Sequence, residues 1–309
     1  MSIDILQTGK LLASCEAALA QRYTVHKLHE QADPKAWLAE NGGRIRGHAG
    51  SGVQADLMDR LPKLEIIASF GVGYDNIDTR TAKARNIRVT NTPNVLNDAV
   101  AELTIGLMIA LARRIPQGDQ YVRQGKWPSG NMALYTELTG KTVGILGLGR
   151  IGKEIAVRAQ AMKMRVVYHG RRKQASEPHV FYDNLVDMAR DSDWLVIIAP
   201  GGKGTERIVS REVLTALGPK GMLVNVARGT LVDEPAMLEL LQTGELGGAA
   251  LDVFENEPAV PEAFFALENV VLSPHQGSAT NQTRDAMGAL LVANLDAHFA
   301  GEPLISAVV

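Results

Sequence analysis

Short apolar runs alternate with amphipathic stretches through the first third of the chain. Apolar runs of this length, bounded by glycine and polar residues, are typical of buried strands. The stretches between them are typical of helices, as over Ala55–Arg60 and Asp78–Arg85. The alternation predicts an open α/β sheet in this region. Its strands are expected at Ile3–Leu6, Tyr23–Leu28, Ile45–Gly47, Ile66–Phe70 and Ile87–Thr90.

The same alternation returns in the second half of the chain, where six apolar runs are separated by helical patterns. Six parallel strands with intervening helices describe a complete doubly wound domain. The strands are expected at Thr142–Leu146, Arg165–Tyr168, Trp194–Ile198, Met222–Asn225, Gly248–Asp252 and Val270–Leu272.

Three further segments connect or extend these two regions. Asp98–Arg114 is apolar nearly all round and predicts a buried helix. Tyr121–Leu138 carries aromatic residues among glycine and proline, and it predicts an irregular segment that serves domain packing, a subunit contact or a pocket rim. Thr283–Phe299 predicts an apolar helix beyond the sixth strand that crosses back to the N-terminal domain.

A glycine motif follows the first strand of the second half. Gly147-Leu148-Gly149-Arg150-Ile151-Gly152 stands between that strand and a helix expected over Lys153–Met162. The first glycine permits a tight turn, the second lets the backbone approach a pyrophosphate, and the third lets the helix pack on the strand. The helix N-terminus adds N–H groups and a positive dipole end. We predict that these six residues bind a dinucleotide; a chance glycine turn is the alternative.

The residues after the second of these strands predict which nicotinamide cofactor is bound. In an NAD site an Asp or Glu at this point accepts hydrogen bonds from the ribose. Here Gly170 takes that place, Arg171, Arg172 and Lys173 follow, and the first carboxylate is Glu177. Arginine can donate two parallel hydrogen bonds to phosphate oxygens. The turn therefore predicts NADPH in preference to NADH, with Gly170, Arg171 and Arg172 as contacts. The alternative is a solvated basic turn.

Three polar residues fall where late strands end, at the edge where such sheets bind ligands. Arg228 is suited to a substrate carboxylate, His275 to proton donation at a carbonyl oxygen, and Glu257 to holding the imidazole protonated and oriented. Each also has a structural explanation. Arg228 can cap a helix, Glu257 can be a surface acid, and His275 can be a loop histidine whose hydrogen bonds are made within the protein.

Val72 and Gly73 follow the predicted strand Ile66–Phe70 and can expose backbone N–H groups to an anion. The alternative is a turn followed by a helix that Asp78 caps.

Composition narrows the class of protein. Lysine and arginine number 32 against 34 aspartates and glutamates, which points to neither a nucleic-acid nor an anionic-membrane partner. Cys15 is the only cysteine, which excludes an internal disulfide framework and a cysteine-based zinc site, and no metal site is expected. The apolar stretch Leu103–Ala112 is too short to cross a bilayer, and no signal peptide is evident, so a cytoplasmic location is expected.

The chain resembles the D-2-hydroxyacid dehydrogenases, the D-isomer-specific family, over nearly its whole length. The glycine loop is followed in the family's order by the segments Asn225-Val226-Ala227-Arg228-Gly229, Asp252-Val253-Phe254-Glu255-Asn256-Glu257-Pro258 and Ser273-Pro274-His275. The resemblance implies that Arg228 holds a 2-oxo acid and that His275 is an acid/base paired with Glu257. It also implies that Val72 and Gly73 donate N–H groups to the substrate carboxylate.

The resemblance adds cofactor contacts to those of the glycine loop and the basic turn. They are expected at Pro200, Val226, Ala227, Asp252 and Gly277, with Asp252 at the nicotinamide amide. One departure affects the first of them. Pro200-Gly201-Gly202-Lys203-Gly204-Thr205 is richer in glycine than the family's usual segment, so this loop departs from the family's pattern.

The resemblance also implies a fold and an activity. The expected α/β fold has two doubly wound domains. A Rossmann cofactor domain at 98–283 is inserted in a smaller flavodoxin-like substrate domain at 1–97 and 284–309, and two copies pair through the cofactor domains. The expected activity is NADPH-dependent reduction of glyoxylate or hydroxypyruvate to the D-2-hydroxy acid. Reduction of hydroxyphenylpyruvate is the alternative, and a non-catalytic nucleotide-sensing regulator is a remote one. Glu257 stands where formate dehydrogenases carry glutamine and therefore argues against formate oxidation.

Overall fold

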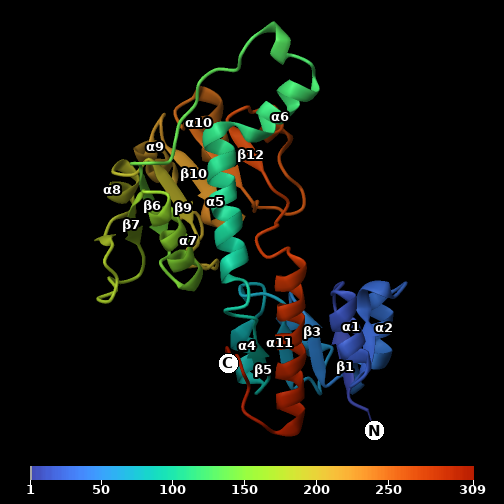
Figure 1. The fold of residues 1–309 in the computed structure, drawn as a ribbon. Helices are drawn as coiled ribbons and strands as arrows, with labels where there is room; N and C mark the ends of the chain where they lie inside the picture. Colours follow the sequence, from blue (N-terminus) through green and yellow to red (C-terminus); the bar gives the residue numbers. More distant parts are fainter. Residues whose placement is uncertain (1) are drawn as a thin grey trace. The chain divides into compact units, whose positions relative to one another are not determined.

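The computed structural model describes residues 2–309, which form two compact units (Figure 1). Unit 1 combines the chain up to Leu96 with Ala279–Val309, and unit 2 is Asn97–Ser278. The sequence predicts these boundaries at 97/98 and 283/284. Among residues 2–309, no helix has both the length and the apolar character needed to cross a membrane.

Unit 1 is a five-stranded parallel sheet with the strand order β2-β1-β3-β4-β5, the order of flavodoxin-like sheets. The strands are β1 Asp4–Gln7, β2 Thr24–Lys27, β3 Gly47–Gly50, β4 Ile66–Ser69 and β5 Arg88–Thr90. The third strand lies further along the chain than the predicted Ile45–Gly47. The helices are α1 Ala13–Ala20, α2 Pro34–Asn41, α3 Ala55–Asp59, α4 Thr79–Ala84 and α11 Asn281–Ala300.

Two apolar cores cover the two faces of this sheet, because successive side chains of a strand point to opposite sides. Ile5 packs with α1 and α11, whereas its neighbour Leu6 packs with α2, α3 and α4. The C-terminal helix therefore belongs to unit 1, to which the sequence assigns it.

Unit 2 is a parallel sheet with the strand order β12-β11-β10-β9-β6-β7-β8, a Rossmann arrangement with one added edge strand. The strands are β6 Thr142–Leu146, β7 Arg165–His169, β8 Val180–Tyr182, β9 Trp194–Ile197, β10 Met222–Asn225, β11 Gly248–Leu251 and β12 Val270–Leu272. The prediction of six strands is therefore wrong. The missed strand, β8, lies at the edge of the sheet, and its three residues have no buried side chain.

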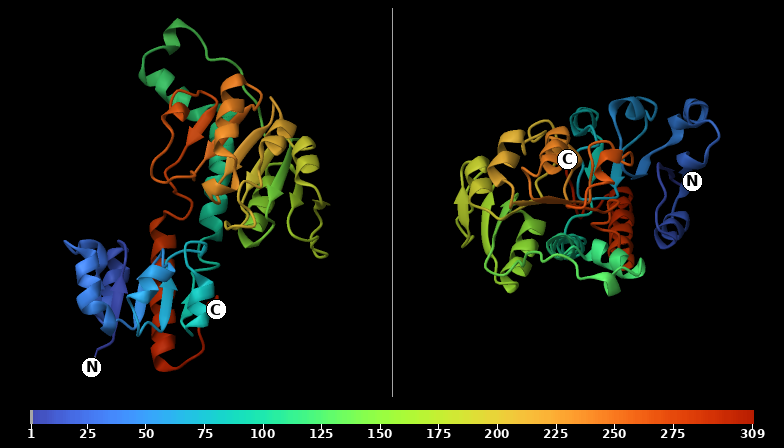
Figure 2. Two further views of the ribbon diagram at one scale, coloured as in Figure 1. Left: turned by 180° about the vertical axis from the view of Figure 1, so that it is seen from behind. Right: turned by 90° about the horizontal axis from the view of Figure 1, so that it is seen from above.

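Helices cover both faces of this sheet (Figure 2). Helices α5 Asn97–Arg113 and α7 Arg150–Ala161 pack together on one face, and α8 Leu185–Arg190, α9 Arg211–Leu217 and α10 Glu234–Thr243 pack on the other. The segment predicted to be irregular begins inside α6 Ile115–Arg123, so that prediction is wrong in part. Single 3-10 turns lie at Leu28–Glu30, Gly42–Arg44, Trp127–Ser129, Gly229–Leu231 and Glu262–Phe264.

Side chains cap several helices by accepting hydrogen bonds from N–H groups of the first turn. The capping residues are Asp33 for α2, Asp78 for α4, Asn184 for α8, Asp233 for α10 and Thr280 for α11. Helix α7 differs from these. It begins behind Gly149 with no side-chain cap, so its first-turn N–H groups are left for another acceptor.

Burial of His48 makes the stability of unit 1 depend on pH. The imidazole lies on β3, is fully buried, and has its Nε2 2.9 Å from Thr8 Oγ1. Burial lowers the pKa of His48 from 6.5 to about 3. Between these two pH values the unfolded chain binds a proton that the folded chain does not. Stability from this group is therefore complete above pH 6.5 and decreases as the pH falls.

We predict that His48→Asn, which does not titrate, flattens this dependence. Between pH 6 and pH 4 the free energy of unfolding of the unchanged protein should fall more steeply than that of the variant, by about 1.4 kcal/mol per pH unit. Urea unfolding followed by circular dichroism at several pH values measures both slopes. Parallel slopes would contradict the prediction.

Candidate active site

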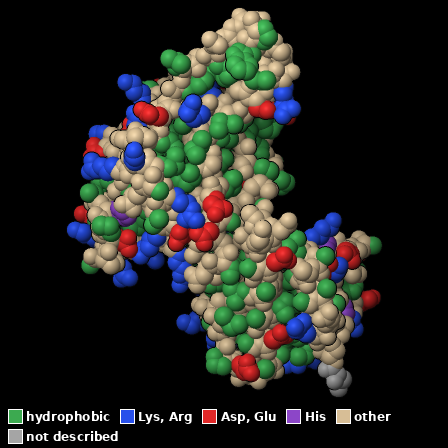
Figure 3. Space-filling view, viewed as in Figure 1, with side chains coloured by type: hydrophobic (Ala, Val, Ile, Leu, Met, Phe, Trp, Pro, Cys, Tyr) green, Lys and Arg blue, Asp and Glu red, His purple; other side chains and the backbone are tan. Residues whose placement is uncertain are grey.

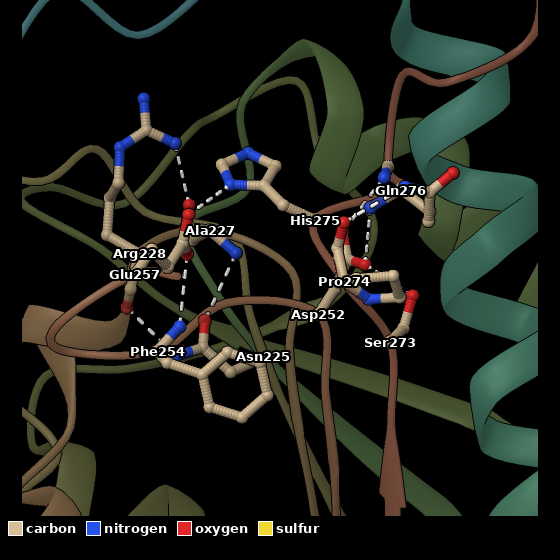
Figure 4. Close-up of polar contacts among 11 residues, drawn as sticks. Asn225, Ala227, Arg228, Asp252, Phe254, Glu257, Ser273, Pro274, His275 and Gln276 are labelled. Carbon is tan, nitrogen blue, oxygen red and sulfur yellow. Dashed lines mark hydrogen bonds and ion pairs between the residues drawn. The ribbon is translucent and has the colours of Figure 1, made fainter. Parts of the chain in front are cut away.

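Three predicted functional side chains lie at the carboxyl edge of three adjacent strands in unit 2. Arg228 follows β10, Glu257 follows β11 and His275 follows β12, and these strands are neighbours in the sheet. Figure 4 draws the three side chains as neighbours at this edge. Residues separated by up to 47 positions in the sequence therefore meet because parallel strands end on the same side.

His275 and Glu257 form a hydrogen-bonded pair. The imidazole Nδ1 lies 2.7 Å from Glu257 Oε2, and Glu257 Oε1 accepts a hydrogen bond from the Phe254 N–H at 3.1 Å. The His275 side chain is 49% exposed and that of Glu257 34%. With Nδ1 directed at the carboxylate, Nε2 is the ring nitrogen left for a ligand.

Asp252 determines the shape of the turn that carries His275. Its carboxylate is buried and accepts three hydrogen bonds, from Ser273 Oγ at 2.6 Å, Gln276 N at 2.7 Å and Gly277 N at 2.8 Å. The Asp252 carbonyl also accepts a bond from the His275 N–H at 2.9 Å. These bonds hold His275 at φ 53°, a left-handed conformation that is uncommon for a residue with a side chain.

Arg228 is placed by a compact turn after β10. The buried Asn225 side chain accepts a bond from Ala227 N and donates one to the Arg228 carbonyl, at 3.1 and 2.8 Å. Arg228 Nη1 donates to the Ala227 carbonyl at 2.7 Å. A Cβ on Gly229 would lie 1.9 Å from the Phe254 carbonyl carbon, so only glycine lets this turn approach the loop that carries Glu257.

Two positioning groups were not predicted from the sequence. Asn225 appears there only as part of a motif, although a polar residue that ends an apolar strand is a usable signal. Glu234 at the start of α10 is buried and accepts a hydrogen bond from the Glu255 N–H at 3.0 Å, and burial raises its pKa. This contact supports the Glu257 loop and could not be predicted from spacing, since it joins residues 21 positions apart.

The glycine loop fits a pyrophosphate. Gly147 has φ 101°, and a Cβ there would lie 2.8 Å from Ala199 N, so this tight turn requires glycine. A Cβ on Gly152 would lie 2.3 Å from the Gly147 carbonyl oxygen, which accounts for the close approach of α7. A Cβ on Gly149 would meet nothing within 4 Å, so open space lies beside the uncapped helix end. N–H donors and open space at one point are what an anion requires.

The remaining predicted cofactor contacts differ in how far their side chains are exposed. Arg171 and Arg172 are exposed after β7, and Gly170 is partly exposed. Pro200 is exposed, and its carbonyl accepts a bond from Thr205 Oγ1 at 2.8 Å, which closes the glycine-rich loop. Leu148, Val226, Ala227, Asp252 and Gly277 are buried. The cofactor role of these residues stays a prediction.

Val72 and Gly73 lie in unit 1 after β4. Asn91 Nδ2 donates to the Val72 carbonyl at 2.9 Å, and Asp78 caps the helix that follows. Within the described part of unit 1, the N–H groups of Val72 and Gly73 donate no hydrogen bond. The capped-turn interpretation and the anion-binding prediction are therefore compatible, and anion binding stays a prediction. Across residues 2–309, no group of three or more His, Cys, Asp or Glu could hold a metal ion.

Residues 105–277 match the family model described as "D-isomer specific 2-hydroxyacid dehydrogenase, NAD binding domain". This match covers more than half of the chain and includes the glycine loop, Arg228, Glu257 and His275.

Two related proteins match over nearly their whole length. The chain is 46% identical to hydroxyphenylpyruvate reductase of Plectranthus scutellarioides and 46% identical to glyoxylate/hydroxypyruvate reductase A of Arabidopsis thaliana. Each match covers 100% of this chain and 99% of the relative. A crystal structure of NADPH-dependent glyoxylate/hydroxypyruvate reductase from Sinorhizobium meliloti, in complex with NADP and malonate, superposes with a TM-score of 0.95. It is 43% identical, and the match covers 100% of this chain and 97% of that one.

The three bonds to Asp252 generate a prediction about stability. Asp252→Asn preserves shape but replaces one acceptor oxygen by an N–H group, so at least one donor of the His275 turn is left buried without an acceptor. Because a hydrogen bond to a charged group contributes about 1.5–3 kcal/mol, the free energy of unfolding should fall by about 2 kcal/mol in urea denaturation. Asp187→Asn, at an exposed pair with Arg190, is the matched control and should cost less than about 1 kcal/mol. Equal losses in the two variants would show that Asp252 does not hold the turn.

Proposed function

Because the chain belongs to the family of D-isomer specific 2-hydroxyacid dehydrogenases, we propose that it reduces a small 2-oxo acid to the D-2-hydroxy acid with NADPH. The family makes it an oxidoreductase that binds a nicotinamide cofactor and acts on 2-oxo or 2-hydroxy acids. The observation that carries the proposal is the His275–Glu257 pair beside Arg228 at the sheet's carboxyl edge.

Each of the three side chains has a separate task in this proposal. The Arg228 guanidinium binds the substrate carboxylate and polarises the adjacent carbonyl. His275 donates a proton from Nε2 to the carbonyl oxygen, since Nδ1 is held by Glu257. Glu257 keeps the ring oriented and stabilises its protonated form. A bound reduced nicotinamide supplies the hydride.

The cofactor is held by the glycine loop and the basic turn. The N–H groups at the uncapped start of α7, beside the open space at Gly149, donate to the pyrophosphate, and Arg171 and Arg172 donate to the 2′-phosphate of NADPH. The related protein from Sinorhizobium meliloti is described as NADPH-dependent, which supports this preference. In the same proposal Asp252, whose carboxylate holds the His275 turn, also faces the nicotinamide amide.

Glyoxylate and hydroxypyruvate are the first candidate substrates. Hydroxyphenylpyruvate is the second candidate, because a relative of that name is as similar to the chain as the glyoxylate/hydroxypyruvate reductase is. Loss of NADPH absorbance with glyoxylate, hydroxypyruvate, pyruvate and hydroxyphenylpyruvate separates the candidates. No oxidation of NADPH with any of them would favour the nucleotide-sensing regulator.

We propose further that two copies pair through the cofactor domain, at residues 115–135, a segment that begins with α6. Its apolar side chains are largely exposed, Trp127 by 62% and Leu134 by 98%, and Figure 3 shows hydrophobic side chains at the surface of this segment at the top of the view. Monomers rarely expose apolar side chains in such a group. Light scattering should give the mass of two chains, and a mass of one chain would refute the pairing.

His275→Ala should retain NADPH binding and lose turnover. Removing a general acid costs about 10²–10⁴ in rate, whereas the glycine loop and the basic turn are untouched. Steady-state kinetics gives the rate, and NADPH fluorescence titration gives the binding. Near-normal turnover in this variant would remove His275 from the mechanism.

Replacing both Arg171 and Arg172 by alanine should narrow the preference for NADPH over NADH. At about 1.5–3 kcal/mol for a hydrogen bond to a charged group, the ratio of the two kcat/KM values should fall by about tenfold to a hundredfold. Lys220→Ala, at an exposed cation in the turn before β10, is the control and should leave the ratio unchanged. An equal ratio in the double variant and the unchanged protein would mean that the basic turn is only solvated.

A further inference from the structure

We propose that Gln174 is a positioning residue that holds the basic turn in register with the glycine loop and thereby sets selectivity for the cofactor's 2′-phosphate. The inference rests on the proposed NADPH preference and extends it to a neutral side chain just beyond the arginines. Gln174 is partly buried, whereas Arg171, Arg172 and Lys173 before it are all exposed.

Both ends of the basic turn are bonded to consecutive residues of the glycine loop. At its start, the His169 carbonyl accepts a hydrogen bond from Gly147 N at 2.9 Å. At its end, Gln174 Nε2 donates to the Leu148 carbonyl at 2.7 Å. Residues 170–173 therefore span two fixed points on the loop that is proposed to bind the pyrophosphate.

Two further contacts hold the far end of the turn. The backbone N–H of Gln174 donates to the hydroxyl of Tyr168, whose side chain is fully buried in the sheet, at 2.8 Å. Glu177 lies 2.7 Å from Lys153 Nζ on the first turn of α7. The end of the basic turn is thus tied to β7, to the glycine loop and to the helix that follows that loop.

The charges explain why such a tie is needed. Three adjacent cations, Arg171, Arg172 and Lys173, repel one another, and exposed side chains of this kind have no packing to restrain them. A dinucleotide carries its pyrophosphate and its 2′-phosphate on one framework. Donors for the two groups act together only if their backbones keep a fixed spacing, which the Gln174 bond provides.

The test compares Gln174→Met with the unchanged protein. Methionine has a similar length but no N–H donor, so the variant separates the hydrogen bond from packing. The probes are 2′,5′-ADP and 5′-AMP, which differ in the 2′-phosphate, titrated by calorimetry. We expect about fivefold weaker binding of 2′,5′-ADP and unchanged binding of 5′-AMP. Gln160→Ala, at an exposed glutamine on α7, is the control and should change neither.

A second arm repeats Gln174→Met in the variant that lacks both Arg171 and Arg172. If Gln174 acts through the arginines, adding Gln174→Met to that variant leaves the ratio of the dissociation constants for 2′,5′-ADP and 5′-AMP unchanged. If the unchanged protein binds 2′,5′-ADP more tightly than 5′-AMP and Gln174→Met keeps this preference, the inference is wrong and the NADPH proposal stands. Equal weakening of both probes would also overturn it, because Gln174 would then support the glycine loop in general. A parent that binds both probes equally would overturn the NADPH proposal and the inference with it.

Discussion

The parallel direction of the seven strands in unit 2 is the constraint on which the candidate site depends. All seven strands end at the same edge, so the loops after them meet there regardless of their separation in sequence. The glycine loop follows β6, the basic turn follows β7, and Arg228, Glu257 and His275 follow β10, β11 and β12. A sheet with alternating strand directions would send half of these groups to the opposite edge.

The loops at this edge are joined to one another as well as to the sheet. Asp252 bonds the segment after β11 to the turn after β12, and the close approach of Gly229 to Phe254 joins the segments after β10 and β11. On the other side of β6, Gln174 links the segment after β7 to the glycine loop. These contacts fix the positions of the loops relative to one another, which strand pairing alone does not do.

The sequence was a reliable guide where a local rule decides the structure. Strand β6, the turn at Gly147 and the end of β10 follow from apolar runs and glycine chemistry, and the chain has them where they are expected. Strand β8 was missed because its apolar run, Val180–Tyr182, is only three residues long and lies at the edge of the sheet with no buried side chain. Glu234 and Gln174 act through partners 21 and 26 positions away, which only the folded chain brings near, so no spacing rule predicts their roles. Asn225 bonds residues two and three positions ahead, and a polar residue that ends an apolar strand is a signal that the sequence does contain.

The exposure of His275 has a consequence for repeated turnover under the proposed mechanism. Half of its side chain faces water, while its other ring nitrogen is occupied by Glu257. An imidazole that has given up its proton can be recharged directly by hydronium ions or buffer acids. Under the proposed mechanism, buffer acids can therefore reprotonate His275 without a relay of buried side chains.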